Sequence, residues 1–269
     1  MQSTSEQQFY LQLEFLGFRY HGWQHQPGTR TLEGMLRKTL RFVLPGTRVK
    51  ILAASRTDAK VSAIDFALQL LVRGHQLMDA DWLLEALNAN LPSDIRVVSV
   101  SRRTLQFNAI RDCLSKTYGY YFCFGPKPHP FSASLLGYFP GLLDITAMTA
   151  AASLFEGRHN FRGFTAGSTE KKRVIRTIGE SHILPNKELT ASFFPKQSYI
   201  FKVSGNGFGR YQVRLMMAAL ADIGRGKADA ATLRSVLETG NDWPGGSIAP
   251  ASGLQLLQST MESQTQSPI

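Results

Sequence analysis

Short segments in which apolar and polar residues alternate constrain the fold of this chain more than any other feature. In "FYLQLEFLG", residues 9–17, Leu11, Leu13 and Phe15 lie on one side of an extended chain and polar residues lie on the other. This pattern predicts a half-buried β-strand. Further strands are expected at 49–54, 64–72, 94–101, 116–124, 173–184, 198–208 and 253–258.

Other segments have helical periodicity. In residues 31–44, Leu32, Leu36 and Leu40 recur on one stripe, and Thr31 suits the N-cap. Helices are also expected at 80–92, 145–157, 211–224 and 228–240. Because several strands follow one another without an intervening helix, we predict an α+β fold with a mixed, largely antiparallel central sheet flanked by helices.

The segment "GPKPHPF", residues 125–131, is the strongest break in the chain, with three prolines and a glycine. We therefore expect two similar α+β halves, an N-terminal one at 1–125 and a C-terminal one at 126–269 that completes the sheet. The polar tail, residues 259–269, has no periodicity and is expected to fray.

Composition indicates an ordinary globular protein, because 43% of the 269 residues are hydrophobic and 19% are charged. Two cysteines are too few for a disulfide framework and suit a reducing compartment. No signal peptide or membrane helix is visible, so we expect a cytoplasmic protein without membrane contact.

The net charge is +10, from 30 Lys and Arg against 20 Asp and Glu. An excess of this size suits a polyanionic partner, and nucleic acid comes first. The alternative is that the excess serves only solubility.

Common catalytic motifs are absent from the sequence, and no two of the six histidines have metal-ligand spacing on one helix face, so we expect no metal site. Attention falls on "SRTDAK", where Asp58 follows the apolar strand 49–54 and lies between Arg56 and Lys60. Asp58 is either a turn acid paired with a neighbouring arginine or an ionised carboxylate positioned for chemistry.

Five segments of the sequence, one of which contains Asp58, bear on the role of this residue. "SRTDAKVSA" resembles the signature loop of the tRNA pseudouridine synthase family of the bacterial TruA type. "FLGFRYHGWQHQPGTRTLEGMLRKTL", "FNAIRDCLSKTYGYYF", "GNGFGRYQVRLMMAAL" and "APASGLQLL" resemble four further segments of that family. The five segments occur in the family's order and span almost the whole chain.

The resemblance implies an RNA pseudouridine synthase that isomerises uridine to pseudouridine. Such an enzyme breaks the glycosidic bond, turns the uracil and rejoins it through carbon, with no cofactor. The implied substrate is tRNA, in the anticodon stem-loop at tRNA positions 38–40, and the implied assembly is a homodimer.

The resemblance also implies roles for individual residues. Asp58 is the catalytic carboxylate, Arg214 pairs with it, Tyr118 stacks on the target base, and Leu254 walls the pocket. The candidate RNA-binding residues are Arg56, Lys60, Arg19, Lys171, Lys172 and Arg173.

Weaker interpretations stay open for some of these residues. Tyr118 could equally be a core aromatic of its strand, and Arg214 a solvated residue near a helix start. The cluster "EKKRVIR" could likewise be a solvated face.

The loop also departs from the family pattern G-R-T-D-A-G-V-H-A. Ser55 and Lys60 replace glycines, Ser62 replaces a histidine, and Leu16 stands where the opening strand usually has an aspartate. If position 60 needs positive φ, lysine there bends the loop at a cost, or else the loop differs in shape. The competing functions are a non-catalytic RNA-binding protein on the same scaffold and a structural protein with an incidental turn acid.

Overall fold

The computed structural model describes residues 5–74, 78–167 and 173–262. The chain forms two compact units, one made of Met1–Leu114 and Leu256–Ile269 and the other of Ser115–Gln255. It passes from the first unit to the second within β5 (Cys113–Gly125) and returns within β10 (Leu254–Met261). The units therefore divide at other points than the predicted boundary at 125/126, because the proline-rich segment is a loop inside the second unit.

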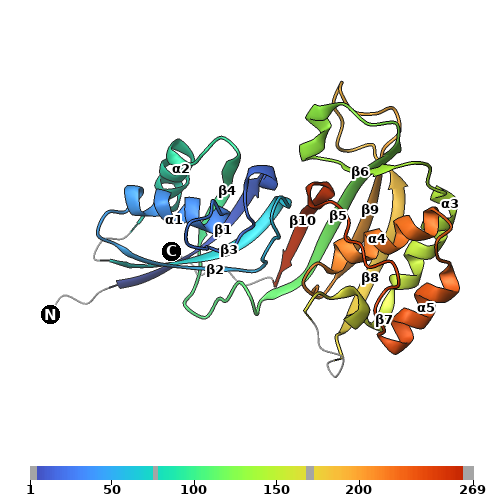
Figure 1. The fold of residues 1–269 in the computed structure, drawn as a ribbon. Coiled ribbons are helices and arrows are strands. Elements are labelled where there is room, and N and C mark those ends of the chain that lie inside the picture. The colour runs from blue at the N-terminus through green and yellow to red at the C-terminus, as the bar shows by residue number, and fades with distance from the viewer. Residues whose placement is uncertain (1–4, 75–77, 168–172, 263–269) are drawn as a thin grey trace. The chain divides into compact units, whose positions relative to one another are not determined.

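The first unit is an antiparallel sheet with two helices (Figure 1). Its strands pair in the order β2–β3–β1–β4. The elements are β1 (Ser5–Phe15), α1 (Leu32–Val43), β2 (Arg48–Ala53), β3 (Ser62–Gly74), α2 (Ala80–Asn90) and β4 (Ile95–Arg102). Leu11 pairs with Leu68 across β1 and β3, and both are fully buried with Leu36 and Leu83 of the helices. The apolar residues of the alternation, Leu11, Leu13 and Phe15, thus form the face of β1 that is buried in the core.

The second unit has the same class of architecture. Strands β5, β9 (Tyr199–Gly205), β8 (Ile175–Pro185) and β7 (Gly157–Asn160) pair successively in antiparallel fashion, and β6 (Gly137–Pro140) is parallel to β5. Its helices are α3 (Ile145–Ala152), α4 (Gln212–Gly224) and α5 (Ala230–Thr239). The prediction of an α+β fold with largely antiparallel strands is confirmed.

Two details of the sequence prediction were wrong. The segment expected to be helical at 145–157 is α-helical only to Ala152, and a 3₁₀ turn follows at Ser153–Phe155. The tail does not fray from residue 259, because β10 runs through Met261, and Ser259 donates from its main chain and its hydroxyl to Asp65. Residues 263–269 lie outside the described part of the chain.

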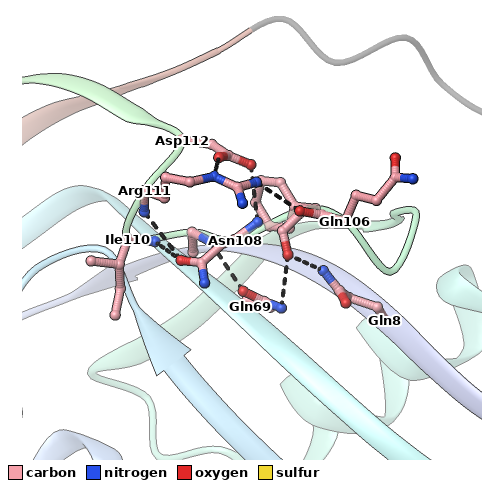
Figure 2. A network of polar contacts seen from close by, with 9 residues as sticks. Gln8, Gln69, Gln106, Asn108, Ile110, Arg111 and Asp112 are labelled. Atoms are coloured by element: carbon pink, nitrogen blue, oxygen red, sulfur yellow. Dashed lines mark hydrogen bonds and ion pairs between the residues drawn. The ribbon is translucent and has the colours of Figure 1, made fainter.

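A buried polar network fixes the loop between β4 and β5 (Figure 2). Gln8 and Gln69 both donate to the carbonyl of Phe107, at 2.6 and 3.1 Å, and Gln69 accepts from the main chain of Ala109. Asp112, almost fully buried, accepts from the main chain of Asn108. Because β1 and β3 supply both glutamines, this loop is bound to the sheet of the first unit.

Candidate active site

Asp58 lies in the loop between β2 and β3 and begins a tight turn. The main chain of Val61 donates to the Asp58 carbonyl at 3.2 Å, and Lys60, the third residue of the turn, has φ 68°. Turns with a left-handed third residue normally place glycine there. Of the two alternatives for position 60, a strained lysine or a loop of different shape, the positive φ of Lys60 favours the strained lysine.

The segment that follows β1 holds this loop through main-chain contacts. Trp23 donates to the Thr57 carbonyl and Lys60 donates to the Tyr20 carbonyl, both at 3.0 Å. Gly22 has φ +90°, and a Cβ on it would lie 2.6 Å from the Thr57 carbonyl oxygen. Asp58 is thus positioned by a glycine that lets two backbones approach closely.

Aromatic side chains anchor that segment in turn. The Trp23 ring is buried against Phe66, with ring centroids 4.3 Å apart. Tyr20 donates its hydroxyl to Asp94 at 2.7 Å, and Arg19 binds the same carboxylate at 2.7 Å. Burial raises the pKa of Asp94, but the hydrogen bonds from Tyr20 and Arg19 outweigh it and hold that pKa below its ordinary value.

The charged residues of the loop differ in exposure. Asp58 is half-buried, whereas Arg56 and Lys60 are exposed, and the Lys60 ammonium lies 5.6 Å from the centre of the Phe18 ring. The hydroxyls of Ser55 and Thr57 are buried with no hydrogen-bond partner among the described residues. The loop therefore directs its cations to solvent and keeps its acid partly shielded.

Tyr118 belongs to β5 of the second unit and is 8% exposed. Its ring meets that of Phe208 edge to face, with centroids 5.1 Å apart. Tyr120, two residues on, points to the same face of the strand. Its hydroxyl donates to the Pro250 carbonyl at 2.7 Å, and burial raises its pKa far above the ordinary value although the charge of Arg214 opposes the shift. Arg214 donates to the carbonyl of Ala249, the residue before Pro250, so it lies near the Tyr120 hydroxyl.

Arg214 is the third residue of α4, and two contacts orient it. Its Nε donates to the Ala249 carbonyl at 2.9 Å, and its guanidinium lies 5.2 Å from the centre of the Tyr211 ring. Tyr211 precedes the helix with φ 62°, in the left-handed region. A cation in the first turn opposes the helix dipole, so this helix end suits an anion beside Arg214.

The remaining predicted residues are spread over both units. Leu254 is buried at the start of β10, Arg173 is exposed, and Arg19 is engaged by Asp94. Lys171 and Lys172 lie outside the described residues. Within 5–74, 78–167 and 173–262, no cluster of His, Cys, Asp and Glu could hold a metal ion, and no helix is long and apolar enough to cross a bilayer.

Sequence reasoning missed two groups that orient Arg214. The Ala249 carbonyl acts through the main chain, which residue identity does not reveal. Tyr211 stands inside the quoted segment "GNGFGRYQVRLMMAAL", but its left-handed conformation has no signal in the sequence, because tyrosine rarely adopts it.

Comparison with known proteins shows which family this chain belongs to. A family model described as tRNA pseudouridine synthase matches residues 151–260. The tRNA pseudouridine synthase A of Thermodesulfovibrio yellowstonii is 31% identical over 251 residues, covering 91% of this chain and 96% of its own length. The protein of the same name from Geotalea uraniireducens is 31% identical, covering 93% and 98%, and that from Streptococcus equi subsp. equi is 33% identical, covering 91% and 94%.

The fold and these similarities define a pseudouridine synthase. The chain belongs to the tRNA pseudouridine synthase family, and its relatives are of the A type. The resemblance drawn from the five sequence segments is thereby confirmed.

Proposed function

We propose that this protein isomerises uridine to pseudouridine in tRNA, with Asp58 as the catalytic carboxylate. Membership of the family over about nine-tenths of the chain is the observation that carries the proposal. The product is an isomer of the substrate: the bond from the ribose C1′ to N1 breaks, a bond from C1′ to C5 forms, C5 loses a proton and N1 gains one. No cofactor or co-reactant is required.

The other residues act by holding the base and the acid. Arg214, in the first turn of α4 where an anion is favoured, pairs with the Asp58 carboxylate and keeps it ionised. Tyr118 stacks on the target base and Leu254 walls the pocket.

Arg56 and Lys60, both exposed on the loop of Asp58, contact the RNA backbone and help to offset the few kcal/mol that flipping a nucleotide costs. Arg19, Lys171, Lys172 and Arg173 are proposed as further RNA contacts.

The test is to map pseudouridine in tRNA incubated with the wild type, Asp58→Asn and Asp58→Ala. We expect both variants to lose at least about 10³-fold in rate while they still bind tRNA, because they remove the reacting group and leave the RNA contacts in place. Equal modification by wild type and variants would refute the role of Asp58. Salt-dependent tRNA binding without any isomerisation by the wild type would instead support the non-catalytic RNA-binding alternative.

Three finer features belong to the same proposal: modification in the anticodon stem-loop at tRNA positions 38–40, action as a homodimer, and a cytoplasmic location. Sequencing the modified tRNA tests the first, sedimentation at working concentration tests the second, and fractionation of cells tests the third. Modification confined to another arm of the tRNA would overturn the first feature and leave the chemistry intact.

A further inference from the structure

Two loops of the second unit bring aromatic rings together at the surface. One loop follows β5 and contains His129 and Phe131, and the other joins β8 to β9 and contains Phe193 and Phe194. Ring centroids lie 4.9 Å apart for His129 and Phe131, 5.9 Å for Phe131 and Phe193, and 5.5 Å for Phe193 and Phe194. We call these four residues the aromatic tip.

One ring of the tip, that of Phe131, is largely exposed, whereas Phe193 and Phe194 are half-buried. Phe131 is 70% exposed although it packs edge-on against two other rings. Burying the Phe131 side chain would stabilise the folded chain, and the chain forgoes that stabilisation here. An exposed aromatic patch of this kind is typical of an interaction site.

Hydrogen bonds hold both loops of the tip in place. The Ser132 hydroxyl, fully buried, donates to the His129 carbonyl at 2.7 Å, and Nδ1 of His129 accepts from the main chain of Phe131. In the other loop, the Asn186 side chain donates to the Leu189 carbonyl and to the Ser198 hydroxyl. The rings are therefore pre-organised, and a ligand that stacks on them orders little of the protein.

The charges beside the rings indicate what the ligand is. The segments 126–136 and 186–198 contain three lysines, Lys127, Lys187 and Lys196, all exposed, against one carboxylate, that of Glu188. Aromatic rings interleaved with cations are the pattern that binds unpaired nucleotides, because each base has a face to stack and each phosphate a negative charge. In a chain of net charge +10, this favours RNA over a protein partner.

The position of the tip within the second unit separates it from Tyr118. Strand β5 continues from Tyr118 to Gly125 before the first loop begins, a span of about 23 Å at roughly 3.3 Å per residue. The β8–β9 connection emerges at the same end, because Pro185 pairs with Tyr199 and Tyr199 pairs with Phe122 (Figure 1). A base bound at the tip is therefore not the base that stacks on Tyr118.

We propose that the aromatic tip stacks an unpaired nucleobase of the substrate tRNA, a different base from the target uridine. This inference rests on the proposed function for the identity of the RNA. The tip contributes affinity, through Phe131 above all, and takes no part in the isomerisation.

The experiment measures tRNA binding at fixed salt for Phe131→Ala, Phe131→Leu and Phe131→Trp. We expect the dissociation constant to rise about tenfold for alanine and leucine, since both lose the ring, and to stay near the wild-type value for tryptophan. Phe42→Ala is the matched control, because Phe42 is 73% exposed in the first unit and none of the aromatic contacts of the tip involves it. It should bind tRNA as the wild type does.

Two binding results would overturn the proposal: unchanged binding by Phe131→Ala, or full binding by Phe131→Leu. At saturating tRNA, kcat of Phe131→Ala should equal that of the wild type, and a reduced kcat would contradict a role in binding alone. Because binding is measured without catalysis, a wild type that forms no pseudouridine refutes the proposed function and not the tip.

Discussion

Each unit holds one non-glycine residue in the left-handed conformation, and the two units support it differently. Among the described residues these are Lys60, two positions after Asp58, and Tyr211, three before Arg214. Main-chain hydrogen bonds to the segment of Tyr20 and Trp23 support the loop of Lys60. Side chains support the other site, since the Tyr211 ring lies under the guanidiniums of Arg210 and Arg214.

This difference in support determines at which of the two sites a residue can be replaced without a change in local structure. A loop held by its backbone keeps its shape when side chains vary, which explains how Ser55 and Lys60 can replace glycines of the family pattern. A site held by ring and guanidinium contacts depends on residue identity. Backbone strain of this kind commonly accompanies functional sites, and here it lies beside Asp58 and Arg214, the two residues that we propose act together.

The largest effect is expected from Gly22→Ala, which tests the backbone support of the first unit. The new Cβ would meet the Thr57 carbonyl oxygen at 2.6 Å, at a residue with φ +90°. Strain and overpacking together should lower the free energy of unfolding by about 3 kcal/mol and displace Asp58. Urea unfolding and the rate of pseudouridine formation measure the two effects.

Gly28→Ala is the matched control for this change. Gly28 also has positive φ, 71°, but a Cβ there would meet nothing within 4 Å. It should cost about 1 kcal/mol, from strain alone. Equal costs at the two glycines would show that the close approach to Thr57 contributes nothing.

Arg214→Lys tests the side-chain support of the second unit. Lysine has no planar fork, so it loses the Nε bond to the Ala249 carbonyl and stacks less well on Tyr211. We expect the rate at saturating tRNA to fall about 100-fold while the charge is retained. Arg234→Lys, at an exposed position of α5, should leave the rate unchanged. An active Arg214→Lys enzyme would mean that position 214 supplies charge alone.

The sequence predicted the parts of the fold whose pattern is local. Strand β1 and helix α1 were recognised because each repeats its apolar period several times. Strands β6 and β7 have four residues each, too few to show a repeating apolar pattern. They form because they pair with the longer strands β5 and β8. The extension of β10 through Met261 depends on Asp65, which is 194 residues away from Ser259 in the chain.

The same distinction applies to the candidate site. Asp58, Tyr118 and Arg214 were found through motif identity, and their roles stay predictions. That Asp58 lies in a loop directly after a strand was also predictable, from the apolar run before it. The contact of Arg214 with the Ala249 carbonyl was not, because it joins a side chain to a main-chain group 35 residues away. The contact with Tyr211 was not either, because it accompanies a left-handed backbone that tyrosine rarely adopts.

A smaller effect is expected from pH, through the acid that supports the Tyr20 segment. The pKa of Asp94 is lowered in the folded chain, so its carboxylate stabilises the fold above the ordinary aspartate pKa of about 3.9, and this contribution disappears as the pH falls through the lower folded value. Asp94→Asn should unfold with about 1 kcal/mol less free energy at pH 6, and the gap should close below about pH 4. A gap that persists undiminished to pH 2 would contradict this role.

The smallest effect is expected from Lys60→Gly, and its sign is opposite to that of the others. Glycine adopts φ 68° without the steric penalty that lysine carries, so the free energy of unfolding should rise by about 0.5–1 kcal/mol despite the loss of the contact with Phe18. Lys50→Gly, at an exposed position of β2, should instead lower it by about 0.5–1 kcal/mol, because glycine weakens a strand. If Lys60→Gly also weakens tRNA binding, the chain retains a strained lysine beside Asp58 for its charge; if binding is unchanged, Lys60 is not the RNA contact that we propose.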